Sequence, residues 1–362
     1  MEGRILDEEL IRNYDQENFV NEDPIRVQET LYSNENTTNS EFIKSYSSNV
    51  KLYGISFQNN RSQVRLGVSS IETHESNVIE VVEYDSNIDK LKRTAFADVE
   101  FPCTKILWSP SRNNNSVLAT TSDFLRLYKY NENSEKISLA TSLKKNQQTG
   151  NFCGPLTSMD WNKENSSILG VCSIDTTCTI WDLTKNEVKT SIIAHDKEVY
   201  DISFCRNENV FITTGGDGSV RVFDTRALDS CSIIFESQDN YPLTRVSWNL
   251  NNPYFIAALG LDKNIIYIID QRITNNPYAF LNYHTNVVNA VSWAPNSNAH
   301  ICSVGDDKNA LIWDIQLISN RSEEPLMAFN SDYEIENVSW SESNDEWIGI
   351  TGSNNLQILK VK

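Results

Sequence analysis

The chain has 362 residues, a formal net charge of −18 and an apolar content of 39%. This acidity excludes a nucleic-acid backbone or an anionic membrane as the main partner, because both require a basic surface. No run of about 18 apolar residues occurs, so no transmembrane helix is expected. The acidic beginning lacks the apolar core of a secretory signal.

The cysteines and histidines argue against disulfide bonds and metal sites. Seven cysteines are scattered without a Cys-x-x-Cys motif, and their number is odd. This usage is typical of free thiols in a reducing compartment, which predicts a cytoplasmic and nuclear protein. The four histidines show no metal-ligand spacing, so we expect no metal and no other cofactor.

Residues 1–41 differ in composition from the rest of the chain. They are rich in Asp, Glu and Asn and carry few large apolar side chains, which predicts a partly disordered acidic extension. One weak helix is expected near "EELIRNY". From residue 42 onward, short β-branched and aromatic runs alternate with Asn, Asp, Gly and Ser clusters, a pattern typical of an all-β domain.

A short run that ends in an aromatic residue recurs along this second part. The seven aromatic positions are Phe57, Trp108, Trp161, Phe204, Trp248, Trp293 and Trp340. A second run follows and ends in Trp-Asp or an equivalent in most repeats, as at Trp181 and Trp313. The signal is weaker in the first repeat, where "NVIEVVEYD" at 77–85 takes that place. A period of about 44 residues with a terminal Trp-Asp indicates WD repeats, each of which forms four strands of one propeller blade.

The repeats predict an all-β, seven-bladed WD-repeat β-propeller over residues 42–362. A single blade cannot bury both faces of its sheet, so the ring must close. The last repeat ends after three strands, near "LQILKV". We therefore expect "EFIKSYSS" at 41–48 to supply its outer strand, closing the ring by pairing an N-terminal strand with the last blade and covering a sheet edge.

Polar residues recur in register with these repeats. The sets are His284, Ser303, Asp307 and Trp313 in repeat six; His195, Thr213 or Thr214, and Asp217 in repeat four; and Ser173, Asp175 and Trp181 in repeat three. Each set resembles part of a hydrolase triad. A single active site would not recur with the period of the fold, so we predict structural hydrogen-bond networks. No catalytic residue and no enzymatic activity are expected, and Cys178 is predicted to fill the core.

Five stretches carry a closer resemblance. They are "PLTSMDWN" (155–162), "SIDTTCTIWD" (173–182), "IAHDKEVYDISF" (193–204), "GGDGSVRVFDTR" (215–226) and "DDKNALIWDIQ" (306–316). They resemble the Transparent Testa Glabra / anthocyanin-eleven family, whose animal members are cullin-ligase-associated, kinase-binding WD-repeat proteins. The resemblance implies a non-catalytic scaffold for protein kinase or transcription factor complexes, with no small-molecule substrate. The alternative that it implies is a substrate receptor of a cullin-RING ubiquitin ligase.

In the family that this chain resembles, the ubiquitin-ligase role is marked by a local sequence motif. "FITTGGDGSVRVFDTR" at 211–226 fits that motif throughout, and "FIAALGLDKNIIYIIDQR" at 255–272 fits it in part. The resemblance then implies that Arg226 and Arg272 lie on the bottom rim of adjacent blades and hold acceptor oxygens of the ligase's adaptor. The other interpretation is that each arginine pairs with Asp224 or Asp270 of its own blade.

Further partner-binding residues are expected on the top rim, where loops between blades suit peptide and domain docking. The candidates lie just before the first strand of three repeats: Lys197, Glu198 and Tyr200 in repeat four, Arg245 in repeat five, and Asn286 and Asn289 in repeat six. Tyr and Arg are residue types enriched at binding hot spots.

Overall fold

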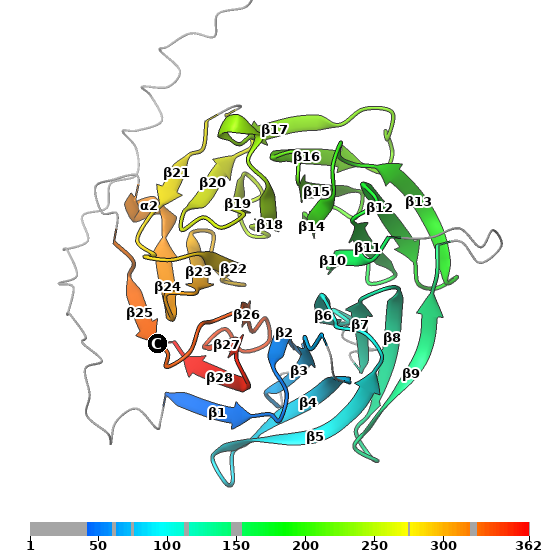
Figure 1. Cartoon of the computed structure of the whole chain (residues 1–362), viewed down its shortest axis with the longest axis vertical. Helices are drawn as coiled ribbons and strands as arrows, with labels where there is room; N and C mark the ends of the chain where they lie inside the picture. The colour runs from blue at the N-terminus through cyan, green and yellow to red at the C-terminus, as the bar shows by residue number, and fades with distance from the viewer. Residues whose placement is uncertain are drawn as a thin grey trace, which may run out of the picture. The chain divides into compact units, whose positions relative to one another are not determined.

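Seven four-stranded antiparallel sheets surround a common centre in the computed structural model (Figure 1). The structure describes residues 42–59, 63–73, 76–111, 116–145, 154–273, 276–318 and 324–361. Each sheet is one blade, so the predicted all-β, seven-bladed propeller is confirmed. The prediction of an acidic, partly disordered extension over 1–41 lies outside the described residues.

The strands of each blade follow chain order from the inner to the outer edge of the sheet. Blades 1 to 3 are β2–β5 (Leu52–Phe57, Arg65–Ser70, Asn77–Asp85, Lys90–Val99), β6–β9 (Lys105–Trp108, Val117–Thr121, Leu125–Asn131, Lys136–Leu143) and β10–β13 (Leu156–Trp161, Ile168–Ser173, Thr177–Asp182, Glu187–Ile193). Blades 4 to 6 are β14–β17 (Val199–Phe204, Val210–Gly215, Ser219–Asp224, Ser232–Glu236), β18–β21 (Leu243–Trp248, Phe255–Gly260, Ile266–Asp270, Ala279–Leu281) and β22–β25 (Val288–Trp293, His300–Gly305, Asn309–Asp314, Met327–Asn330).

Blade 7 is built from both ends of the propeller sequence. Its strands are β26 (Asn337–Trp340), β27 (Trp347–Gly352), β28 (Asn355–Lys360) and β1 (Ile43–Ser47). β1, in blue, lies beside β28, in red, and pairs with it antiparallel from Ile43 opposite Leu359 to Ser47 opposite Asn355 (Figure 1). The predicted closure of the ring by an N-terminal strand is therefore confirmed.

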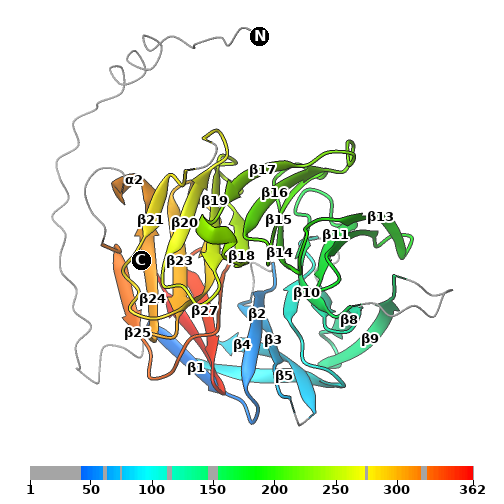
Figure 2. The same cartoon turned by 45° about the horizontal axis from the view of Figure 1, so that its top comes forward.

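Helical structure is minor in the described part of the chain. It consists of the short helix α2 (Ile315–Ile318) and the 3-10 turn η2 (Gln238–Asn240). α2 lies beside β21 in both views (Figures 1 and 2), and Ile315 packs into the core between blades 5 and 6. Neither helix is long enough to cross a membrane.

The core lies between neighbouring blades because the strands in the middle of each sheet bury side chains on both faces. In β12, Cys178 and Ile180 pack with Phe204 and other residues of blade 4. Trp181, on the opposite face of the same strand, packs against Leu125 and its neighbours in blade 2. Cys178 is fully buried, as a core residue should be.

Two faces of the ring follow from the strand order. The loops that enter each inner strand lie with the hairpins between second and third strands on one face, which we call the top face. The loops that follow the first and third strands lie on the other, the bottom face.

Candidate functional site

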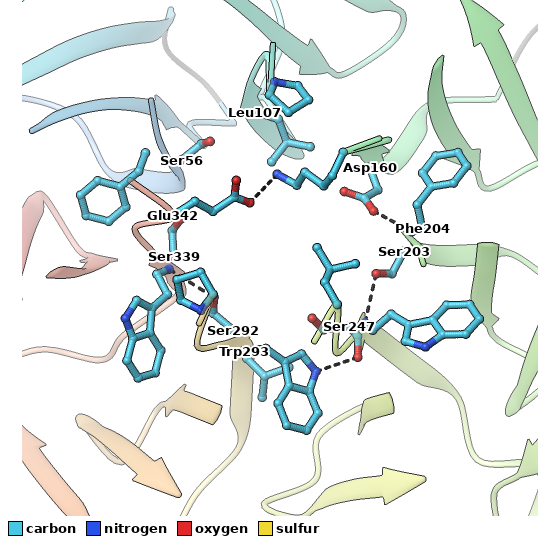
Figure 3. A pocket seen from close by; sticks show the side chains of 18 of the residues that line it. Ser56, Leu107, Asp160, Ser203, Phe204, Ser247, Ser292, Trp293, Ser339 and Glu342 are labelled. Atoms are coloured by element: carbon cyan, nitrogen blue, oxygen red, sulfur yellow. Dashed lines mark hydrogen bonds and ion pairs between the residues drawn. The ribbon is translucent and has the colours of Figure 1, made fainter. Parts of the chain in front are cut away.

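The inner strands enclose a central channel with a cavity volume of about 550 Å³. The penultimate residue of each inner strand forms a ring around it (Figure 3). In blade order the ring contains Ser56, Leu107, Asp160, Ser203, Ser247, Ser292 and Ser339. Five of the seven blades thus place a small hydroxyl side chain at this level of the channel.

Three of these serines join neighbouring blades. The Oγ atoms of Ser56, Ser203 and Ser292 accept hydrogen bonds from the backbone N–H groups of Trp108, Trp248 and Trp340 in the next blade, at 3.1, 3.1 and 3.2 Å. The bonds satisfy backbone donors that the inner edge of each sheet would otherwise leave unpaired. The Ser-aromatic pair of the repeat is therefore a blade-to-blade connection.

Asp160 stands where other blades have serine, and it accepts two backbone hydrogen bonds, one from its own blade and one from the next blade. Leu107 in the preceding blade has no acceptor to offer the Trp161 N–H. Asp160 Oδ1 accepts that bond itself at 2.9 Å, while Oδ2 accepts from the Phe204 N–H of the next blade at 2.7 Å. A carboxylate at this position thus compensates for the leucine before it.

Burial raises the pKa of the Asp160 carboxyl to about 6, although Lys163 and the two backbone donors favour its charged form. The folded chain therefore keeps this proton up to about pH 6, whereas the unfolded chain loses it near pH 4.

We expect the contribution of Asp160 to the free energy of unfolding to fall as the pH rises from about 4 to about 6. The carboxyl is partly exposed to the channel, which limits the expected fall to about 1 kcal/mol. Denaturant unfolding of the parent and of Asp160→Asn across this pH range measures the difference. Ser203→Ala is the matched control in the same ring, and its difference from the parent should not depend on pH.

Charged side chains connect blades across the channel. Lys163 Nζ lies 2.8 Å from Glu342 Oε1, so this ion pair joins the bottom loops of blades 3 and 7. Lys105 Nζ lies 3.8 Å from Asp201 Oδ1, which also accepts a 2.6 Å hydrogen bond from Ser158. None of these charged side chains is among the predicted site residues, although Asp160 and Leu107 depart from the Ser-aromatic pattern in the sequence.

The top mouth of the channel has a cavity of about 350 Å³ lined in part by Tyr200, Arg245 and Asn289. These three residues lie inside β14, β18 and β22 rather than before them, so their predicted position in the entry loops is wrong. Arg245 Nη2 donates to the Tyr53 hydroxyl at 2.6 Å. It is therefore a channel residue and not a rim cation.

Asn289 is also engaged within the fold. Its Nδ2 donates to Asp306 Oδ1 at 2.6 Å and to the Ile335 carbonyl oxygen at 2.9 Å. The loop residues Lys197, Glu198 and Asn286 are exposed on the top face, as expected for residues before a first strand.

The network of blade 6 connects four buried side chains. Trp313 Nε1 donates to Ser303 Oγ at 2.9 Å, and Ser303 Oγ lies 2.8 Å from His284 Nε2. His284 Nδ1 lies 2.9 Å from Asp307 Oδ2. Since the carboxylate accepts from Nδ1, Nε2 accepts from the serine hydroxyl, and the imidazole is neutral. Burial lowers the pKa of His284 in agreement with this assignment, despite the nearby Asp307.

Blade 4 repeats the arrangement without the tryptophan. His195 Nδ1 lies 2.8 Å from Asp217 Oδ1, and Nε2 lies 2.8 Å from Thr213 Oγ1. The structure thus selects Thr213 over Thr214 as the partner of the histidine. Phe223 stands at the tryptophan position and has no N–H to donate.

Blade 3 does not form the network, which corrects our grouping of Ser173, Asp175 and Trp181. Val171 occupies the strand position that corresponds to Ser303, so the buried Trp181 Nε1 has no hydrogen-bond partner among the described residues. Ser173 lies two residues further along and donates to the Gly154 carbonyl oxygen at 3.1 Å. Asp175 accepts from Thr177 at the turn.

The two bottom-face arginines each pair with the aspartate of their own blade. Arg226 Nη2 lies 2.5 Å from Asp224 Oδ2, and Arg272 Nη2 lies 2.6 Å from Asp270 Oδ2. In both pairs Nε also donates to Oδ1 at 2.9 Å. The arginine side chains remain 64% and 57% exposed, respectively. Local pairing therefore fixes each guanidinium and leaves its Nη1 group for another acceptor.

Comparison with known proteins places this arrangement in a family. Residues 144–182, 186–224 and 275–314 match the family described as WD domain, G-beta repeat. The "DDB1- and CUL4-associated factor 7 homolog" of Dictyostelium discoideum is 40% identical over 322 residues, which cover 88% of this chain and 98% of that protein. The chain belongs to the WD-repeat family of DDB1- and CUL4-associated factor 7.

Two fungal WD repeat-containing proteins are also similar to this chain. An uncharacterized WD repeat-containing protein of Schizosaccharomyces pombe is 31% identical, covering 82% of this chain and 84% of that protein. A WD repeat-containing protein of Saccharomyces cerevisiae is 35% identical over 60% of this chain and 48% of its own length. The described part of this chain contains no group of three or more side chains placed to hold a metal ion.

Proposed function

We propose that this chain is a non-catalytic substrate receptor of a cullin-RING ubiquitin ligase, attached to the ligase's DDB1 adaptor through its bottom face. The Dictyostelium relative is named for association with DDB1 and CUL4. The observation that carries the proposal is the repeated Asp–Arg pair, which presents Arg226 and Arg272 in the same geometry on adjacent blades. Fixed guanidinium groups suit carboxylate and carbonyl acceptors on a protein partner.

The broader proposal is an interaction scaffold whose top face remains open while the bottom face is occupied. Loops around Lys197, Glu198 and Asn286 are exposed there and suit docking of a substrate or a second adaptor. The resemblance to the Transparent Testa Glabra / anthocyanin-eleven family adds protein kinases and transcription factors as candidate partners, in the cytoplasm and nucleus. Affinity purification from native cells, followed by identification of the partners, tests this part.

Replacing Arg226 and Arg272 together with alanine should abolish co-purification of DDB1, because both outward donor groups are lost. The expected loss of affinity is at least about tenfold, equivalent to about 1.4 kcal/mol. Arg206→Ala is the control, since Arg206 is an exposed arginine of the same face outside the repeated pair. Thermal unfolding shows whether the variants are folded. Undiminished binding by the folded double variant would contradict the proposal.

A further inference from the structure

The surroundings of the two arginines are unequal. The Arg272 guanidinium lies 4.1 Å from the ring centroid of Tyr254, within cation–π range. Tyr254, Ile273 and Tyr278 are 43%, 50% and 36% exposed. The residue directly after Arg226 is the small Ala227, where Ile273 follows Arg272, and the nearby exposed residues Asp229 and Ser230 also lack a large apolar side chain. We call Tyr254, Arg272, Ile273 and Tyr278 the blade-5 patch.

The blade-5 patch is held rigidly by the loops that carry it. The Gln271 backbone N–H donates to the Tyr254 carbonyl oxygen at 3.0 Å, and the Gln271 side chain donates to the Pro253 carbonyl oxygen at 2.9 Å. The Tyr278 ring packs on Phe255 with centroids 4.9 Å apart. Asp270, which holds Arg272, is 2% exposed, whereas Asp224 is 30% exposed. The patch therefore loses little conformational freedom on binding.

Asparagine side chains connect the patch to the next blade. Asn251 Nδ2 donates to the carbonyl oxygens of Pro295 and Ser297 at 2.7 and 3.1 Å. Asn249 Nδ2 donates to the Asn298 carbonyl oxygen at 3.1 Å. The bottom loops of blades 5 and 6 thus form one continuous support.

This sector lacks the negative charge that dominates the chain. Residues 249–254, 271–278 and 294–299 contain no Asp, Glu or Lys, and Arg272 is their only charged residue. The chain as a whole has a net charge of −18. Because Asp270 pairs with Arg272, the patch is close to neutral, and an acidic partner is repelled less there than by the rest of the chain.

We infer that the blade-5 patch is the main anchor for the DDB1 adaptor, and that the adaptor offers it an apolar surface that bears a carboxylate. This inference rests on the proposed function. The carboxylate pairs with the Nη1 side of Arg272, while Tyr254, Ile273 and Tyr278 bury against apolar side chains. Arg and Tyr in a rigid, desolvated cluster are the residue types that dominate interface energies. Arg226 contributes a weaker contact at the edge.

Calorimetric titration of purified DDB1 into purified full-length variants tests the inference. Tyr254→Ala with Ile273→Ser should weaken binding at least about tenfold, whereas Arg226→Ala alone should weaken it less than about threefold. Tyr254→Phe keeps the ring that contacts Arg272 and should bind like the parent. All of these side chains are exposed, so the variants should unfold at the parent's temperature.

These experiments distinguish a failure of the blade-5 anchor from a failure of DDB1 binding itself. If the Arg226 and Arg272 double variant loses binding while the Tyr254 and Ile273 variant keeps it, the blade-5 patch is not the anchor and the proposed function stands. If neither variant loses binding, both are overturned. Equal losses from Arg226→Ala and Arg272→Ala would also overturn the dominance of blade 5.

Discussion

Ser303→Ala is expected to lower the free energy of unfolding by about 3 kcal/mol, although it removes one atom. The Ser303 hydroxyl receives the Trp313 N–H and donates to His284 Nε2, and the serine is fully buried. Alanine leaves both ring nitrogens without a partner in the core. The cost is the desolvation of two polar groups, which exceeds the worth of an ordinary hydrogen bond.

Blade 4 provides the matched comparison. Thr213→Val removes the hydroxyl that faces His195 while keeping the side-chain volume, and Phe223 leaves no indole N–H to be orphaned. Its expected cost is about half as large, about 1.5 kcal/mol, because one polar atom loses its partner instead of two. Denaturant unfolding of the two variants measures both values. Equal costs would show that the Trp313 bond adds nothing to the network.

Gly218→Ala is expected to destabilise the fold by about 3 kcal/mol through two separate causes. Gly218 ends the turn between β15 and β16 with a φ of 78°. A Cβ at this position would lie 2.6 Å from the Asn240 carbonyl carbon and 2.7 Å from the Tyr241 carbonyl oxygen. These are backbone atoms of the loop that contains η2, so the clash requires that loop to move.

The corresponding turn of blade 6 separates the two causes. Lys308 occupies the same position with a φ of 65°, which shows that the left-handed conformation alone tolerates a side chain. Lys308→Gly relieves that conformation without a clash and measures the conformational cause alone, with an expected change in the free energy of unfolding of about 1 kcal/mol. Thermal unfolding compares the pair. If Gly218→Ala changed the free energy of unfolding by no more than the blade 6 variant does, the loop that contains η2 would move aside without destabilising the fold.

The architecture could be predicted from the sequence because the repeat is redundant. Seven copies of an aromatic-terminated strand hold phase, so the loss of one signal, as in the first repeat, does not hide the others. The missing fourth strand of blade 7 follows from the same count, and β1 supplies it. Register in the middle strands is likewise fixed by burial on both faces, as in β12.

The side-chain contacts between blades were harder to predict from the sequence. Trp181 was grouped with Trp313 because both end a third strand, but the partner depends on one position of the second strand, where Val171 replaces serine. Arg245 looked like a rim residue because the strand begins earlier than its apolar run suggests. Its partner, Tyr53, is 192 residues away in sequence, and no local pattern indicates such a pair.

The pairing of β1 with β28 has a consequence for how the protein is made. Blades 1 to 6 each draw their four strands from one contiguous stretch, so they can form during synthesis as each stretch leaves the ribosome. Blade 7 has to wait until residue 360 has been added, since β1 has no partner before then. Through that interval β1 is an unpaired strand, open to chaperones or to another chain. Assembly of the ring therefore depends on its last strand.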